Sequence, residues 1–355
     1  MGLPNVIINF KSTGTTAAQR GDKGTVALIL TDETNKGFMQ LEGIKDIPSN
    51  FTKENKEYIE RAFIGGISVP KKVLLYVLAN DAENYNEAFS FLETVSFDYL
   101  VGPHNMSTQL ANTIATWIKE QRDSLDKKVK AVLPSIVADH EGIINFDTTN
   151  IRVGEATFTN TQYCSRVAGL IAGTPLKVAC TFTPLPEVTD VPRMTNAQLS
   201  AEIDKGKFLI FHDGEKVKVA RGVNSLVTTN AEKSAAFKKI KIVDILDLIN
   251  TDIKKNANDN FIGKFPNSYD NKCILITAIK AYYEQLENDE LLERGISTIE
   301  IDMAAQTNYL KSIGIDTSSM NDYDIKSANT ADKVFLTSTI KVLDAIEDIT
   351  INIAI

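Results

Sequence analysis

The stretch Thr25-Val26-Ala27-Leu28-Ile29-Leu30 is a continuous apolar run, bounded by Gly24 on one side and Asp32 on the other. Such a run, rich in branched side chains, predicts a strand that is buried on both faces. Further strands are expected at 72–78, 97–101 and 130–133, and helices at 52–64, 84–95, 107–123 and 161–172. Because strands alternate with helices, we predict an α/β fold in which helices cover a parallel or mixed sheet.

A second unit of mixed α and β structure is expected to follow. Residues 207–211 and 217–220 predict a hairpin around Asp213-Gly214 at the end of the first unit. Beyond it we expect helices at 243–255, 271–294 (one or two helices) and 305–313, and strands at 296–304 and 334–346. We therefore divide the chain into an arm and linker over 1–24, an α/β body over 25–240 and a C-terminal domain over 241–355. A subdivision of the body into 25–95 and 96–240 is left open.

The chain ends in an unusual stripe, Ile349-Thr350-Ile351-Asn352-Ile353-Ala354-Ile355. A period of two places all four isoleucines on one face of a β-strand. A bare terminal strand exposes unpaired N–H and C=O groups, which proteins normally cover, charge or pair. This strand either folds back on residues 334–346 or is donated to another chain by β-strand addition.

The N-terminus predicts a second strand-like arm, with Val6, Ile8 and Phe10 on one face and a Thr/Gly/Ser/Ala-rich linker after it. Residues 1–25 hold three cations and one anion, a net charge of +2, and residues 331–355 hold two cations and four anions, a net charge of −2. Opposite charge on two apolar arms favours pairing between subunits. The alternative is that both termini join the sheet of their own domain.

Composition excludes several classes of protein. The 355 residues carry 43% hydrophobic and 24% charged residues, which is ordinary for a globular protein. A net charge of −8 without a Lys/Arg run argues against direct nucleic-acid binding. The sequence has no apolar stretch long enough for membrane insertion and no signal-peptide pattern, so we expect a cytosolic protein. The three widely spaced cysteines are expected to be reduced.

No constellation in the sequence predicts an active site. The histidines are far apart, at His104, His140 and His212. Only Asp139-His140-Glu141 suggests a metal-ligand trio, and adjacent side chains diverge on a regular element, so we predict a solvated loop there. We predict no catalytic residue, no metal and no cofactor.

A possible nucleotide-binding turn is also rejected. Gly169 and Gly173 lie in Ala168-Gly-Leu-Ile-Ala-Gly173, but without the glycine-fingerprint spacing after a strand. Close helix packing is the better interpretation. The sequence contains neither a phosphate loop nor a nucleophile elbow.

One segment makes a family recognisable. Arg221-Gly222-Val223-Asn224-Ser225-Leu226 resembles the Arg-Gly-Val/Ile-Asn-Thr/Ser-Leu segment of contractile phage tail sheath proteins. Together with Arg166-Val-Ala-Gly-Leu-Ile-Ala-Gly173, the chain looks like the short sheath subunit of myophages, defective prophages and phage-tail-like bacteriocins. The resemblance covers nearly the whole chain, from the first arm to the terminal strand.

The resemblance implies a subtilisin-like α/β middle region, without a catalytic triad, and a mixed C-terminal domain. It implies subunits that stack as hexameric rings around an inner tail tube and contract to drive the tube through a cell envelope. Residues 6–10 and 349–355 would be exchanged strands, and 334–343 would belong to the accepting sheet. Baseplate and terminator proteins would be further partners. Assembly would take place in the cytoplasm of the producing bacterium, before release in a phage or phage-tail-like particle.

Two alternatives compete with this interpretation. A nucleotide-dependent α/β enzyme would explain the alternation of strands and helices, but it lacks a glycine fingerprint followed by a suitable acidic residue. An adhesive or pilus-like protein would explain the arms, but the expected signal peptide is missing.

Overall fold

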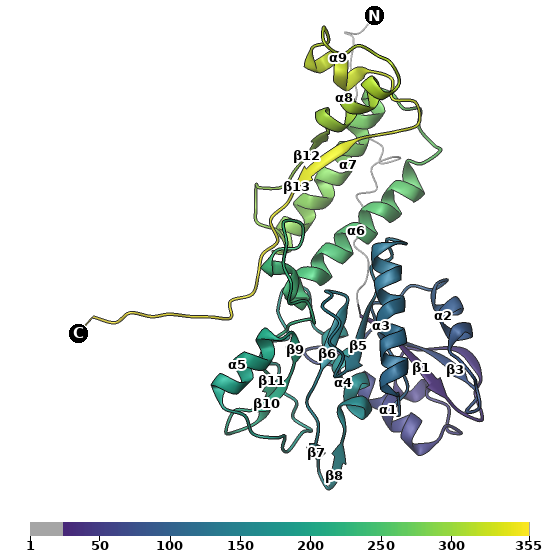
Figure 1. Cartoon of the computed structure of the whole chain (residues 1–355), viewed down its shortest axis with the longest axis vertical. Coiled ribbons are helices and arrows are strands. Elements are labelled where there is room, and N and C mark those ends of the chain that lie inside the picture. The colour runs from purple at the N-terminus through teal and green to yellow at the C-terminus, as the bar shows by residue number, and fades with distance from the viewer. Residues whose placement is uncertain (1–23, 355) are drawn as a thin grey trace, which may run out of the picture. The chain divides into compact units, whose positions relative to one another are not determined.

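The computed structural model describes residues 24–354 (Figure 1). They divide into two compact units. The body unit contains residues 24–247 and 344–354, and the C-terminal unit contains residues 248–343. The last residues of the chain therefore belong with the body unit, although they follow the C-terminal unit in sequence.

A seven-stranded sheet forms the centre of the body unit, in the order β2-β3-β1-β4-β5-β6-β9. Its strands are β1 (Thr25–Thr31), β2 (Gly37–Leu41), β3 (Lys72–Leu78), β4 (Tyr99–Val101), β5 (Lys130–Pro134), β6 (Ile143–Phe146) and β9 (Lys207–Phe208). Neighbouring strands are parallel, except that the edge strand β2 runs antiparallel to β3. The α/β prediction is confirmed.

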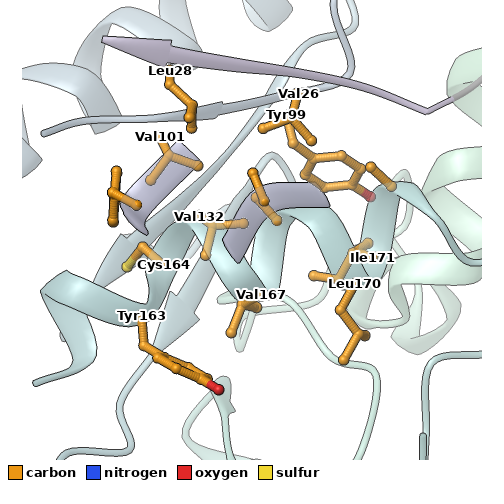
Figure 2. Close-up of a cluster of buried hydrophobic side chains, with 14 of the residues drawn as sticks. Val26, Leu28, Tyr99, Val101, Val132, Tyr163, Cys164, Val167, Leu170 and Ile171 are labelled. Carbon is orange, nitrogen blue, oxygen red and sulfur yellow. The ribbon is translucent and has the colours of Figure 1, made fainter. Parts of the chain in front are cut away.

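Helices cover both faces of this sheet. One face packs against α1 (Lys53–Ile64) and α4 (Asn160–Ala172), and the other against α2 (Asn86–Leu92) and α3 (Thr108–Asp123). In Figure 2, side chains of the central strands, including Leu28 and Val132, face Val167 and Leu170 of α4. Thr52 and Ser107 cap α1 and α3, since each side chain accepts a backbone hydrogen bond from the first turn.

The glycines of α4 allow two segments to approach closely. A Cβ at Gly169 would lie 1.9 Å from the carbonyl oxygen of Ala62 in α1, and one at Gly173 would lie 1.9 Å from the carbonyl oxygen of Ser68. Any larger residue would force these backbones apart. The predicted close packing is confirmed at both glycines.

The rest of the body unit consists of short elements. They are the 3-10 helices η1 (Ile44–Asp46) and η2 (Ala235–Lys238), the pair β7 (Ile151–Val153) and β8 (Ala156–Phe158), the helix α5 (Asn196–Asp204), and the pair β10 (Ile210–His212) and β11 (Val217–Val219). The predicted hairpin is present as β10–β11, but residues 207–208 pair with β6 instead. The sequence analysis missed β6, because four buried residues show no periodicity.

The C-terminal unit is built on two long helices. The helix α6 (Ile240–Asn260) begins in the body unit, and α7 (Tyr269–Asn288), α8 (Met303–Ser312) and α9 (Asp322–Ser327) follow. The prediction that the second helix extends to residue 294 is wrong. Glu290 adopts a left-handed φ of 57°, and the buried Leu291 and Leu292 that follow pair with residues 342–343 instead.

A two-stranded antiparallel sheet completes this unit, formed by β12 (Thr298–Ile301) and β13 (Leu336–Thr339). The strand expected over 334–346 is therefore limited to four residues, because residues 341–343 continue along Leu291–Glu293 through a single bridge. Residues 349–354 form no helix or strand. Among the helices of residues 24–354, none is both long and apolar enough to cross a lipid bilayer.

Candidate functional site

The segment Arg221–Asn224 follows β11 and is held tightly by its glycine. A Cβ at Gly222 would lie 2.9 Å from the Sγ of Cys180. The Gly222 amide donates to the Thr181 hydroxyl at 2.9 Å, and its carbonyl accepts from the amide of Ile240 at 3.0 Å. The segment is thereby fixed between residues 180–181 and the start of α6.

Asn224 makes the next turn of this segment rigid. Its side chain is fully buried, donates to the carbonyl of Phe237 at 2.7 Å and accepts from the amide of Leu226 at 3.0 Å. Its own amide donates to the carbonyl of Lys238 at 2.9 Å, and Val223 forms a β-bridge with Lys239. A short polar side chain that bonds to the nearby backbone is a common means of fixing a turn.

Arg221 and Lys239 both bind the acidic residues that precede the terminal isoleucines. Arg221 lies 3.1 Å from Glu347 and 2.6 Å from Asp348, and Lys239 lies 2.5 Å from Asp344 and 3.2 Å from Glu347. We call this set the arm anchor; it comprises Thr181, Arg221, Lys239, Asp344, Glu347 and Asp348.

Glu347 is the centre of the arm anchor. Its side chain is only 8% exposed, and it accepts a 2.5 Å hydrogen bond from the Thr181 hydroxyl in addition to its two ion pairs. The bond to Asp348 and the pair with Glu347 outweigh partial burial and raise the pKa of Arg221. Burial lowers the pKa of Lys239, but Asp344 and Glu347 more than offset this effect and hold it above its ordinary value.

An apolar hollow of about 180 Å³ lies beside the arm anchor. Its walls include Phe182, Leu199, Ile203 and Phe211, together with Arg221 and Glu347. The helix α5 supplies one wall by packing Leu199 and Ile203 on the β10–β11 pair. The charged residues that line it, Arg221, Glu347 and Asp348, are paired with one another in the arm anchor.

Beyond Asp348 the predicted arm is exposed. Ile349, Ile351 and Ile353 are 74%, 75% and 82% exposed, and Figure 1 draws this segment as a thin extended coil. Within residues 24–354 it pairs with no strand. Ile355, Val6, Ile8 and Phe10 lie outside the described residues.

The β12–β13 sheet has alternating faces and open edges. One face carries Ile299, Ile301 and Leu336, and the other carries polar side chains, namely Thr298, Glu300, Thr337 and Thr339. In the part of the chain that the structure describes, each strand pairs only with the other. Among residues 24–354, each strand therefore has one edge without a strand partner.

Comparison with known proteins identifies the family. The chain is 38% identical to the tail sheath protein of Clostridium phage phiCD119 over 357 residues, which cover 99% of both chains. This chain belongs to the phage tail sheath family. The model of the phage tail sheath protein central domain matches residues 79–225, and that of the phage tail sheath C-terminal domain matches residues 232–355. The sheath chain is accordingly a structural subunit and not an enzyme.

Solved sheath structures share the fold. The sheath tail protein of Desulfitobacterium hafniense matches with a TM-score of 0.70 at 18% identity, covering 96% of this chain and 100% of that one. The anti-feeding prophage helical sheath in its contracted state matches with a TM-score of 0.72 at 15% identity, covering 100% of this chain and 99% of that one.

A buried ion cluster attaches the first turns of α6 to the rest of the body unit of this sheath protein. Arg122 of α3 binds Asp247 through two 2.9 Å bonds, and Lys130 of β5 lies 2.6 Å from Asp247 and 3.2 Å from Asp244. Tyr99 donates to Asp244 at 2.6 Å. Burial opposes the charge on Asp247, but Lys130 and Arg122 more than compensate and hold its pKa below the ordinary value.

The prediction of a solvated loop at His140 is wrong. His140 and Glu141 are buried, and with Asp123 they form a group of possible metal ligands, all within 4.8 Å of one another. These two residues follow a turn at Asp139, where φ is 49°, and do not lie on a regular helix or strand. Burial is also the main cause that lowers the pKa of His140, against the opposing effects of Glu141 and Asp123.

This group does not fit a metal ion. The amide of Gly142 donates to the Nδ1 of His140 at 3.0 Å, so the neutral ring carries its proton on Nε2, which faces Asp123 at 3.3 Å. A metal on Nε2 would require that proton to move to Nδ1, against the amide. Glu141 is already bound to Lys233 at 2.9 Å and lies 3.5 Å from Arg122. The Glu141 carboxylate is therefore already occupied by two cations of the body unit.

Sequence reasoning found Arg221, Gly222, Val223 and Asn224 but missed their partners in the sheath chain. Lys239 and Thr181 carry no local signal. The acidic residues before the isoleucines did give a sequence signal, a net negative charge, but we attributed that charge to pairing between arms. In the structure, three of these carboxylates, at 344, 347 and 348, bind cations of their own body unit.

Proposed function

We propose that this sheath subunit polymerises as stacked hexameric rings around an inner tail tube and contracts to drive the tube through a target cell envelope. The fold shared with helical sheaths in the contracted state, those of the anti-feeding prophage and of an extracellular contractile injection system, supports this proposal. So does the full-length relationship to a phage tail sheath protein.

Strand exchange would connect the subunits, and the exposed isoleucine stripe is the observation that carries this part of the proposal. Ile349, Ile351 and Ile353 are apolar and alternate, and no strand of their own chain covers them in residues 24–354. The open edges of β12–β13 offer the missing backbone partners, with the apolar residues Ile299 and Leu336 on one face. Adding the arm there pairs its N–H and C=O groups and buries its isoleucines.

We assign a separate role to each successive segment of the chain. Residues 1–24 and 349–355 act as arms, residues 25–240 form most of a rigid body, and the C-terminal domain that begins at residue 241 accepts strands through residues 334–343. Val6, Ile8 and Phe10 would form the exchanged strand of the N-terminal arm. Rigid units joined by extended arms can slide past one another without losing their connections.

Contraction in this scheme uses energy stored during assembly. Each subunit would bury more apolar surface in the contracted lattice than in the extended one, at about 25 cal/mol per Å². Even a modest gain per subunit becomes large over a long polymer, and no nucleotide is hydrolysed. The inner tube protein would hold the extended state during assembly.

The proposed partners are further copies of this chain, the tube protein, and baseplate and terminator proteins. A match to a chain in the anti-feeding prophage baseplate, with a TM-score of 0.66 at 14% identity, supports the baseplate as a partner. Assembly would occur in the cytoplasm of the producing bacterium, followed by release in a phage or phage-tail-like particle. No direct contact with nucleic acid and no membrane insertion are proposed.

Negative-stain electron microscopy tests the proposal. The purified chain, alone and with its tube protein, is compared with a copy that ends at Asp348 and with the double variant Ile351→Asn, Ile353→Asn. Long hollow tubes with six-fold end views should form only from the intact chain. The matched control Asn352→Ser, on the opposite strand face, should assemble normally. Tubes from the truncated copy would refute strand exchange, and discrete particles from the intact chain with tube protein present would refute polymerisation.

A further inference from the structure

We propose that the arm anchor sets the register in which the terminal strand pairs with the neighbouring subunit. This inference rests on the strand exchange proposed above. It gives the segment Arg221–Asn224, which holds the arm anchor in place, a role in assembly.

The terminal stripe does not determine its own register. Isoleucines at 349, 351, 353 and 355 repeat every two residues. A slip by one residue would turn the isoleucines to the wrong face, but a slip by two places isoleucine where isoleucine was. The other face offers only Thr350, Asn352 and Ala354, with no proline, glycine or charge to mark a position. Something outside the strand must therefore select among registers two residues apart.

The arm anchor lies at the position where such selection is possible. Asp348 immediately precedes the first isoleucine, and its carboxylate lies 2.6 Å from Arg221. Glu347 is held by Arg221, Lys239 and Thr181 and is nearly buried. The arm therefore leaves the body unit from a fixed point, and Ile349 cannot move along an acceptor strand without breaking these contacts.

The length of the arm limits the registers that its strand can adopt. Seven residues in a strand span about 23 Å, and a two-residue slip displaces them by roughly 7 Å. Releasing residues 344–348 would add up to about 17 Å of slack, enough for several registers. While the ion pairs of the arm anchor are formed, the arm has no extra chain length that would allow a two-residue slip.

The neighbouring residues of the family motif hold the anchoring arginine in place. Gly222 allows the close approach to Cys180 and bonds to the same Thr181 hydroxyl that donates to Glu347. Asn224 ties the segment to residues 237–238, next to Lys239. The two cations of the arm anchor thus come from two segments that the motif itself joins.

Disulfide cross-linking in assembled polymers tests the inference. On a Cys273→Ser background, Asn352→Cys serves as the donor, and acceptor cysteines are placed singly on the polar face of either strand. The acceptor pairs, two residues apart, are Thr337→Cys and Thr339→Cys on β13, and Thr298→Cys and Glu300→Cys on β12. With the arm anchor intact, one acceptor of a pair should cross-link at least tenfold more than the other.

Two kinds of variant then disturb the arm anchor. Asp344→Asn with Asp348→Asn removes two exposed carboxylates, and the preference should fall to within about twofold. The matched control, Asp81→Asn with Asp332→Asn, makes the same charge change elsewhere and should keep the preference. An Ile-Thr insertion after Asp348 leaves every ion pair of the arm anchor in place and should move the preferred acceptor by two residues.

The outcomes separate this inference from the proposed function. An unchanged acceptor preference in both the charge variant and the insertion variant would overturn the role of the arm anchor while leaving strand exchange intact. Tubes that form without any cross-link to β12 or β13 would overturn strand exchange itself, and this inference with it.

Discussion

Replacing Asp247 by Asn should destabilise the body unit far more than replacing Asp348 by Asn, although both carboxylates bind an arginine. Asp247 accepts two 2.9 Å bonds from Arg122 and one of 2.6 Å from Lys130, and the three side chains are 9%, 4% and 3% exposed. Removing its charge leaves two buried cations undercompensated, a change that typically costs 3–5 kcal/mol. Asp348 is 84% exposed, and an ion pair at an exposed site contributes about 1 kcal/mol or less to the free energy of unfolding.

Urea denaturation provides the assay, with the fluorescence of Trp117 as the reporter. This tryptophan is the only one in the chain and lies in α3, the helix that carries Arg122. With a denaturant slope of about 3 kcal/mol/M, Asp247→Asn should lower the midpoint by about 1–1.7 M, and Asp348→Asn by no more than about 0.3 M.

A second variant distinguishes an undercompensated charge from poor packing. Adding Lys130→Met to Asp247→Asn removes one of the two cations, so the double variant should be more stable than the two single losses predict, by about 1–3 kcal/mol. Additive losses, or a loss below about 1 kcal/mol for Asp247→Asn alone, would show that the ion cluster does not hold α6 in place.

Three further predictions concern the fold. Gly169→Ala should cost at least about 1–3 kcal/mol, because its Cβ would lie 1.9 Å from the Ala62 carbonyl, whereas Gly43→Ala, with nothing within 4 Å, should change the unfolding midpoint little. Asn224→Ala should cost about 1–3 kcal/mol in the same assay by leaving buried backbone groups unbonded, and a neutral result would contradict the hydrogen bonds described. Burial lowers the pKa of His140 in the folded state, so the unfolded state takes up this proton first as the pH decreases. The free energy of unfolding should therefore decrease as the pH drops below 6.5, by at most about 1.4 kcal/mol per pH unit. His140→Gln should lack this slope between pH 6.5 and 5, and an equal slope in both proteins would assign it to other groups.

The sequence by itself determined the elements whose signals are local. Continuous apolar runs at 25–30 and 72–78 predicted buried strands, and local sequence patterns predicted helices at 52–64 and 107–123. Both signals depend on residues that are close in sequence, where the spacing of apolar side chains is sufficient. The resemblance carried by Arg221–Asn224 was likewise local, and it led to the correct family.

Only the tertiary structure decided which distant residues meet. Arg221 and Asp348 lie 127 positions apart, and Arg122 and Asp247 lie 125 apart, so no spacing rule connects them. The same charges on 344–348 are compatible with pairing to another subunit or to the chain's own body, and only folding selects the second. The burial of His140 was missed for a related reason, because its contacts with Asp123 and Ser225 join residues 17 and 85 positions apart. Local patterns specify elements, whereas contacts across the sequence depend on how the whole chain packs.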